Sequence, residues 1–140
     1  MRRLTAQVGF TLIEIMVVVF ILGLLVTLVA PRIIGRTDQA RHTKALADIK
    51  AIEEAMHMFK LDNGFYPSTS EGIAALVSPP PRARNFNPDG YLPQMPKDPW
   101  DHDYIYSFDG RDIHIWSLGA DGVEGGEGAN ADITNFDQTG

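Results

Sequence analysis

Apolar residues are concentrated near the N-terminal end of the chain. Residues 10–30, FTLIEIMVVVFILGLLVTLVA, include one charged side chain, Glu14, and show no alternation of apolar and polar positions. At about 1.5 Å per residue, a helix of this length extends roughly 30 Å, which is the thickness of a bilayer core. The pattern therefore predicts a transmembrane helix over 10–30.

The pattern becomes amphipathic after Pro31. Apolar positions recur at spacings of three and four, with Lys, Asp and Glu between them, as on a helix that packs on a domain. These positions are Ala40, Ala45, Leu46, Ile49, Ile52, Met56 and Phe59. We expect Met56, Met58 and Phe59 in the core rather than at a cofactor site. The helix should continue over 31–62, ending at Asp62-Asn63-Gly64, with Pro31 as a bend or weak point.

Residues 63–140 are predicted to form the soluble domain. Ser68-Thr69-Ser70-Glu71 is typical of a capping box before a short helix over 72–77. A Pro-rich loop covers 78–99, and two short strands, 104–108 and 113–117, are joined at Asp109-Gly110. The tail after residue 117 has no periodicity, so no regular element is expected there. The predicted fold class is α+β, a long helix packed on a small antiparallel sheet.

Residues 1–9, MRRLTAQVG, are short and basic. Arg2 and Arg3 should stay on the cytoplasmic side, which directs the C-terminal domain outward. An ordinary signal peptide is cleaved after its apolar stretch at small residues, and Ala30-Pro31 fits that pattern poorly. The better candidate is the bond between Gly9 and Phe10, which makes residues 1–9 a leader.

Composition narrows the function classes. The formal net charge of −6 becomes −8 without Arg2 and Arg3, and such an acidic chain repels nucleic-acid phosphates. The absence of cysteine excludes disulfides and thiolate metal sites. A small domain without disulfides often depends on a metal ion or on neighbouring subunits. The four histidines are scattered and no catalytic motif is found, so an enzyme is not predicted.

Glu14 is the sharpest functional signal. A carboxylate within a membrane span costs several kcal/mol unless it is paired or neutral. Removal of the leader would leave an α-amine on Phe10, which could pair with Glu14 of an adjacent subunit. The alternative is a protonated or hydrated glutamate at the membrane interface.

The C-terminal loop offers hard oxygen ligands. Asp121, Asp132 and Asn130 lie on a glycine-rich segment with several free carbonyls nearby in sequence. Calcium takes six to eight oxygens from flexible loops, which suits this composition. Many Asp-Gly loops are only turns, so spacing alone leaves both interpretations open.

The chain resembles a known family along its whole length. Gly9-Phe10-Thr11-Leu12-Ile13-Glu14 and the apolar run resemble the cleavage and methylation signal of type IV pilins and pseudopilins. The later segments are similar to the major pseudopilin of type II secretion systems; they are residues 59–67, 71–76, 98–100, 117–122 and 125–128. The chain departs from the family at Asp101-His102-Asp103, where Gly and Pro are common, and at Ser68-Thr69-Ser70.

This resemblance implies a pilin-like fold whose C-terminal loop is stabilised by calcium. It implies cleavage after Gly9, N-methylation of Phe10 and a role for Glu14 in subunit assembly. The implied calcium ligands are the carboxylates of Asp121 and Asp132, the carbonyls of Leu118 and Val123, and Asn130.

The resemblance also implies a location and partners. The subunit would sit in the bacterial inner membrane with its domain in the periplasm, then polymerise into a periplasmic fibre that drives export of folded proteins. Its expected partners are further copies of itself, minor pseudopilins, the inner-membrane assembly platform and prepilin peptidase, but no nucleic acid. The alternatives are a type IV pilin or competence pseudopilin, and a single-pass membrane enzyme or binding domain.

Overall fold

The structure is a computed structural model that describes residues 8–136, except for the side chains of residues 30–34. Its elements are α1 (Leu12–Asn63), the 3₁₀ turn η1 (Ile73–Leu76), β1 (Ile105–Phe108), β2 (Ile113–Ser117), the 3₁₀ turn η2 (Gly128–Asn130) and β3 (Ile133–Thr134). The chain divides into two compact units, residues 1–37 and 38–140, which are described separately. This is the predicted α+β class, with α1 contributing to both units.

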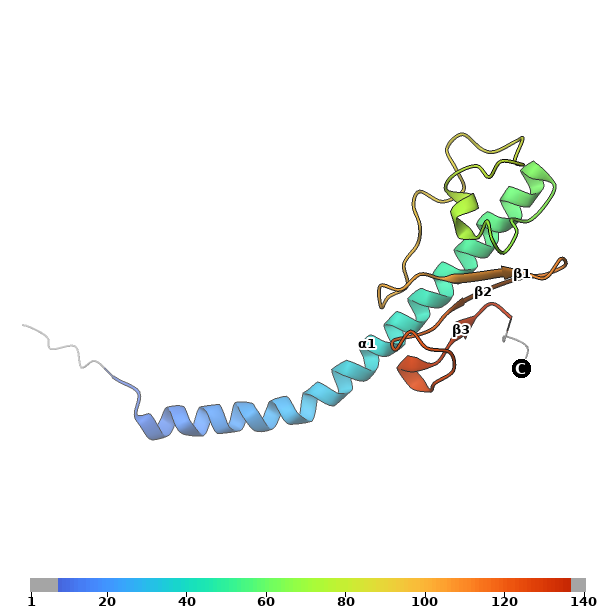
Figure 1. The fold of residues 1–140 in the computed structure, drawn as a ribbon. Helices are drawn as coiled ribbons and strands as arrows, with labels where there is room; N and C mark the ends of the chain where they lie inside the picture. The colour runs from blue at the N-terminus through green and yellow to red at the C-terminus, as the bar shows by residue number, and fades with distance from the viewer. Residues whose placement is uncertain (1–7, 137–140) are drawn as a thin grey trace, which may run out of the picture. The chain divides into compact units, whose positions relative to one another are not determined.

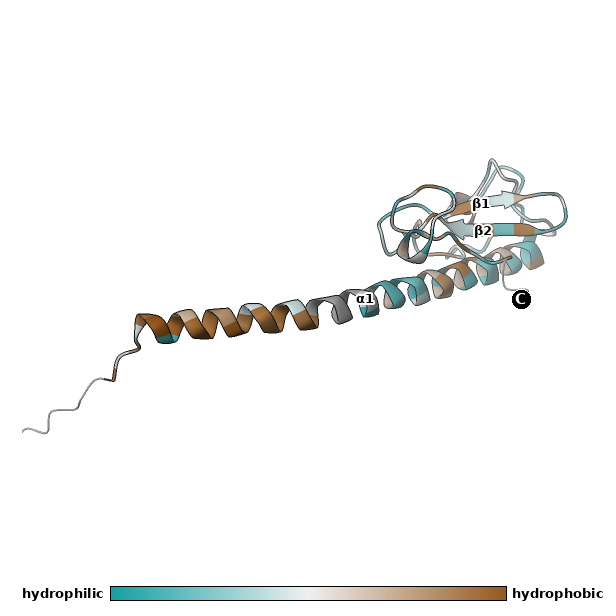
Figure 2. Ribbon diagram, turned by 90° about the horizontal axis from the view of Figure 1, so that it is seen from below, coloured by the Kyte–Doolittle hydropathy of each residue, from teal (hydrophilic) through white to brown (hydrophobic). Residues whose placement is uncertain are grey.

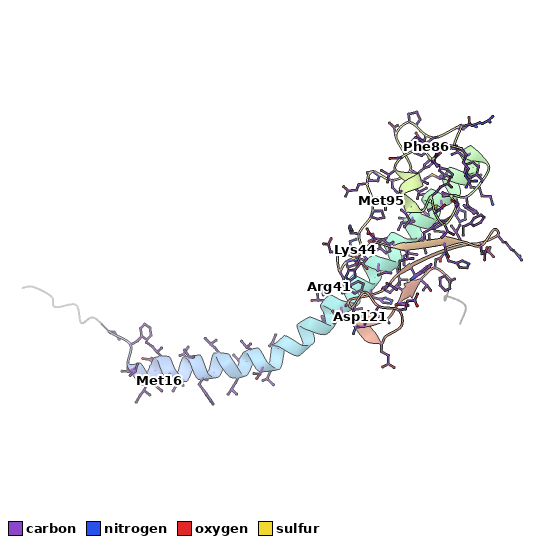
Figure 3. All side chains as sticks on the ribbon, in the orientation of Figure 1. Met16, Arg41, Lys44, Phe86, Met95 and Asp121 are labelled. Carbon is purple, nitrogen blue, oxygen red and sulfur yellow. The ribbon has the colours of Figure 1, made fainter. Side chains whose placement is uncertain are left out.

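The first unit holds the apolar part of α1. Leu12–Val29 is long and apolar enough to cross a membrane, and none of it is buried in the structure. In Figure 2 the ribbon of this stretch is almost entirely in the brown of hydrophobic residues, and Met16 projects from it in Figure 3. The backbone remains helical through Pro31, and the bend proposed there stays a prediction.

In the second unit, the rest of α1 lies along the sheet (Figure 1). Apolar side chains from the helix, η1 and the strands form one core: Ala45, Ile49, Ile52, Ala55, Met56, Phe59, Ile73, Leu76, Tyr104, Tyr106, Ile113, Ile115 and Ile133. The prediction for Met58 was wrong, because this side chain is 50% exposed. Two residues after Met56, it is rotated by about 200° from the core face. Ala40 is also exposed.

The sheet has the order β1-β2-β3 with antiparallel neighbours. The hairpin at Asp109-Gly110 is confirmed. Asp109 Oδ1 accepts the N–H groups of Arg111 and Asp112 at 2.8 and 2.7 Å, and these bonds, first that of Asp112, lower the pKa of Asp109 to about 2. Strand β3 was not expected, because two residues are too short to show a period of two. Ile133 pairs with Ser117 and is buried in the core.

The segment between α1 and the sheet is ordered by packing. Gly64 has φ +85° and its N–H donates to Lys60 O at 2.7 Å, which confirms the predicted helix end. The capping box is also confirmed, since Ser68 N–H donates to Glu71 Oε2 and Glu71 N–H to Ser68 Oγ, at 2.7 and 3.2 Å. It is followed by the 3₁₀ turn η1, which is shorter than the helix expected over 72–77. In the Pro-rich loop, Tyr91 packs edge-on against Phe59.

Candidate functional site

The predicted cleavage position lies just before α1. Val8 and Phe10 are exposed, and a Cβ added to Gly9 would meet no atom within 4 Å. The bond between Gly9 and Phe10 is therefore open to a peptidase as far as the described residues show. Residues 1–7 of the predicted leader lie outside the described residues.

Glu14 lies in the first turn of α1. Its N–H donates to Thr11 Oγ1 at 3.2 Å, so Thr11 caps the helix and Glu14 is the third helical residue. The partial positive charge of a helix N-terminus favours a carboxylate there. Glu14 lines a shallow groove of about 210 Å³ with Phe10, Ile15, Val18 and Val19. Among the side chains that the structure describes, no cation pairs with Glu14. Its carboxylate could therefore pair with a cation of an adjacent subunit.

The five residues predicted to bind calcium lie on one loop between β2 and β3. Leu118 follows β2, Asp121 and Val123 lie in the first turns, Asn130 ends η2, and Asp132 directly precedes β3. Figure 3 labels Asp121 on this loop. Within residues 8–136, no three His, Asp or Glu side chains are close enough to hold a metal by themselves. A cation in this loop would therefore need backbone carbonyl oxygens as additional ligands, and calcium binds such oxygens.

The hydrogen bonds of the loop leave one buried carboxylate oxygen without a partner. Asp121 Oδ1 accepts the N–H of Val123 at 3.1 Å, and Asp132 Oδ2 accepts that of Gly125 at 3.0 Å. Asp132 Oδ1 is buried and has no hydrogen-bond partner. A buried polar atom without a partner is costly, and a bound cation would satisfy it.

Two glycines of the loop allow its backbone to pack closely against carbonyl groups near its C-terminal end. Gly119 and Gly126 have φ of +71° and +89°, and a Cβ on them would lie 2.8 Å from Ala131 O and 2.6 Å from Asn130 O. Side chains at these two positions would therefore push apart the two halves of the loop. The buried, unpaired oxygen of Asp132 directly follows this closely packed segment, and a carboxylate together with loop carbonyls is the type of ligand that calcium prefers.

Sequence reasoning missed a polar cluster next to this loop. Asp98 is 4% exposed, and its carboxylate accepts hydrogen bonds from Trp100 N, His102 N and Ser117 Oγ. In the sequence, Asp98-Pro99-Trp100 contributes only to the family resemblance. The available signal was Asp98 itself, a carboxylate directly before Pro99 and a few residues before the predicted strand 104–108.

The comparisons with known proteins agree across the chain. The family model described as "Type II secretion system (T2SS), protein G" matches residues 32–136, and the "Prokaryotic N-terminal methylation motif" matches residues 6–30. The chain is 49% identical to the type II secretion system core protein G of Vibrio cholerae, over 97% of this chain and 96% of the relative. It is 54% identical to core protein G of Pseudomonas aeruginosa, over 94% and 96%.

A solved structure is also similar. The crystal structure of the major pseudopilin from the type 2 secretion system of enterohaemorrhagic Escherichia coli matches with a TM-score of 0.63 and 42% identity, over 73% of this chain and 91% of that chain. Both the sequence and the fold thus agree with the resemblance. The chain belongs to the protein G family of type II secretion systems.

Proposed function

We propose that this protein is the major structural subunit of the type II secretion pseudopilus, a periplasmic fibre that drives export of folded proteins across the outer membrane. The observation that carries the proposal is the combination of an exposed apolar helix, Leu12–Val29, with a methylation motif and a protein G domain. A type IV pilin or competence pseudopilin is less favoured, because the protein G model covers 32–136, where those classes differ from one another.

The apolar helix has two successive roles in this proposal. It first anchors the subunit in the inner membrane, with the domain of residues 38–140 in the periplasm. It then packs with the helices of other copies in the centre of the fibre, where its all-round apolar surface is buried. Minor pseudopilins and the inner-membrane assembly platform are the proposed partners for this transfer.

Prepilin peptidase would prepare the subunit by cutting after Gly9. The new α-amine on Phe10, once methylated, would be a cation close to the membrane face. Glu14 of the adjacent copy would pair with it, which removes the cost of an isolated carboxylate among apolar helices and fixes the register between copies.

Mass spectrometry of the purified protein tests this processing. We expect a chain that begins at Phe10 with one methyl group. Gly9→Leu should leave the leader attached, because the exposed backbone at Gly9 would then carry a bulky side chain, whereas Gly9→Ala is the matched small substitution. Wild-type protein that still begins at Met1 in its own bacterium would contradict the proposal.

We further propose that calcium holds the C-terminal loop. Asp121, Asp132 and the carbonyls of Leu118 and Val123 would bind the ion, with Asn130 as a further ligand. The ion would tie β3 to β2 through a segment that buries little apolar surface. Ligand binding to the folded state stabilises it by RT ln(1 + [L]/Kd), about 2.7 kcal/mol at a hundredfold excess over Kd.

Thermal unfolding of the full chain in detergent tests the ion. EDTA should lower the melting temperature, and excess calcium should restore it. Asp132→Asn should abolish that difference, whereas Asp89→Asn, at an exposed aspartate on another loop, should retain it. A wild-type melting temperature that is the same in EDTA and in calcium would refute the site.

A further inference from the structure

The strongest polar cluster outside the proposed ligands surrounds Asp98. Its Oδ1 accepts the N–H groups of Trp100 and His102 at 3.0 and 2.8 Å, and its Oδ2 accepts the hydroxyl of Ser117 at 2.6 Å. These three hydrogen bonds hold the carboxylate in one position, because the loss of any of them would leave a buried polar group without a partner. The cluster therefore fixes Ser117, the last residue of β2, and the backbone of His102.

Both residues hold the same glycine at the start of the cation loop. Ser117 Oγ gives its one proton to Asp98, so it accepts the N–H of Gly119, at 3.2 Å. His102 Nδ1 lies 3.2 Å from Gly119 O. A carbonyl oxygen only accepts, so Nδ1 carries the proton. The N–H of Gly119 is thus held by the side chain of Ser117 and its C=O by that of His102, and both residues hydrogen-bond to Asp98, Ser117 through its hydroxyl and His102 through its backbone N–H.

The imidazole ring also fills the space beside the next turn. A Cβ on Gly122 would lie 3.3 Å from His102 Cε1, so the ring packs directly against the backbone there. Gly119 also lies close to the backbone of Ala131, since a Cβ on it would be 2.8 Å from Ala131 O. The segment from Gly119 to Gly122, which includes Asp121, therefore contacts both His102 and the end of the loop.

We infer that Asp98 and His102 are positioning residues for the calcium site, and this inference rests on the proposed calcium binding. They fix the backbone one residue after Leu118 and two residues before Asp121 through hydrogen bonds that involve none of the proposed calcium ligands. A glycine-rich loop loses conformational entropy when it closes around an ion, and a loop that is already held loses less. Neither side chain needs to contact the ion.

Calorimetric titration of calcium into the full chain in detergent tests the role of His102. His102→Leu removes the donor to Gly119, and we expect calcium affinity to fall about two- to tenfold, as for the loss of one hydrogen bond. His102→Asn retains an N–H donor near the position of Nδ1 and should bind within about twofold of wild type. His57→Leu, at an exposed histidine on α1 whose hydrogen-bond partner is Tyr66, is the control and should bind like wild type.

Melting temperatures in EDTA separate positioning from a general loss of stability. The increase on adding calcium should be smaller for His102→Leu than for His102→Asn, while their melting temperatures in EDTA stay close. Equal calcium affinity in wild type and His102→Leu would overturn the inference and leave the calcium site standing. The inference would also be overturned if His102→Leu and His102→Asn lost calcium affinity equally and their melting temperatures in EDTA fell by equal amounts. Absence of calcium binding by the wild type would refute the calcium site itself.

Discussion

The contact between Glu71 and Arg82 allows a quantitative prediction for the soluble domain. Arg82 donates through Nε to Glu71 Oε1 at 2.9 Å and through Nη2 to Oε2 at 2.7 Å. Oε2 also accepts the N–H of Ser68 at 2.7 Å. These bonds, that of Arg82 first, lower the pKa of Glu71 from 4.5 to about 2. The pair thereby joins the capping box to the Pro-rich loop.

The lowered pKa sets an upper limit on the stability that the ionised carboxylate contributes. Each tenfold change in acidity is worth about 1.4 kcal/mol, so the limit is about 3 kcal/mol. Arg82 is 49% exposed, and solvent screens such a pair, so we expect Glu71→Gln to cost about 1 to 2 kcal/mol. For a domain of about 100 residues this corresponds to a melting temperature lower by roughly 5 to 10 °C.

Thermal unfolding at several pH values checks both the magnitude and its origin. The folded pKa of Glu71 lies below its unfolded value, so its stabilising effect is complete above that value and is lost as the pH falls toward 2. The gap between wild type and Glu71→Gln should therefore narrow below about pH 4.5. Glu54→Gln, an exposed glutamate on α1, is the control and should be neutral. A gap that stays constant from neutral to acid pH would refute the electrostatic reasoning.

Two further substitutions probe the backbone. Asp101 has φ +67°, where glycine is favoured, so Asp101→Gly should raise the unfolding free energy by about 0.5 to 1 kcal/mol in a denaturant titration; a loss would show that its side chain is needed. Gly126→Ala should destabilise the domain more than Gly125→Ala, since both have φ +89° but only at Gly126 would the new Cβ lie 2.6 Å from Asn130 O. Equal melting temperatures for these two variants would contradict the packing of the loop.

The parts of the fold that depend on local sequence could be predicted. The end of α1 at Asn63-Gly64 and the hairpin at Asp109-Gly110 follow from local backbone chemistry, because glycine supplies a positive φ at both places. The capping box at Ser68 and Glu71 is local as well. Strand β3 depends on pairing between Ile133 and Ser117, which are far enough apart in sequence that no local pattern reports it.

The polar network at Asp98 is non-local for the same reason. Asp98 and Ser117 become neighbours only when the fold places the end of β2 beside the end of the Pro-rich loop. The unpaired oxygen of Asp132 is likewise a property of the folded loop, and sequence composition could only suggest oxygen ligands. The exposure of Met58 could have been predicted, because the helical period rotates it away from the face that holds the buried Met56.

We propose above that Glu14 pairs with Phe10 of an adjacent copy of the subunit, and its removal tests that pairing. Electron microscopy of fibres, together with an assay of exported protein, measures this directly in cells that produce Glu14→Ala as their only copy. We expect Glu14→Ala to give a stable, processed subunit that remains in the membrane, with few fibres and little export, whereas Glu54→Ala should form fibres normally. Normal fibres and normal export with Glu14→Ala would contradict the proposed pairing.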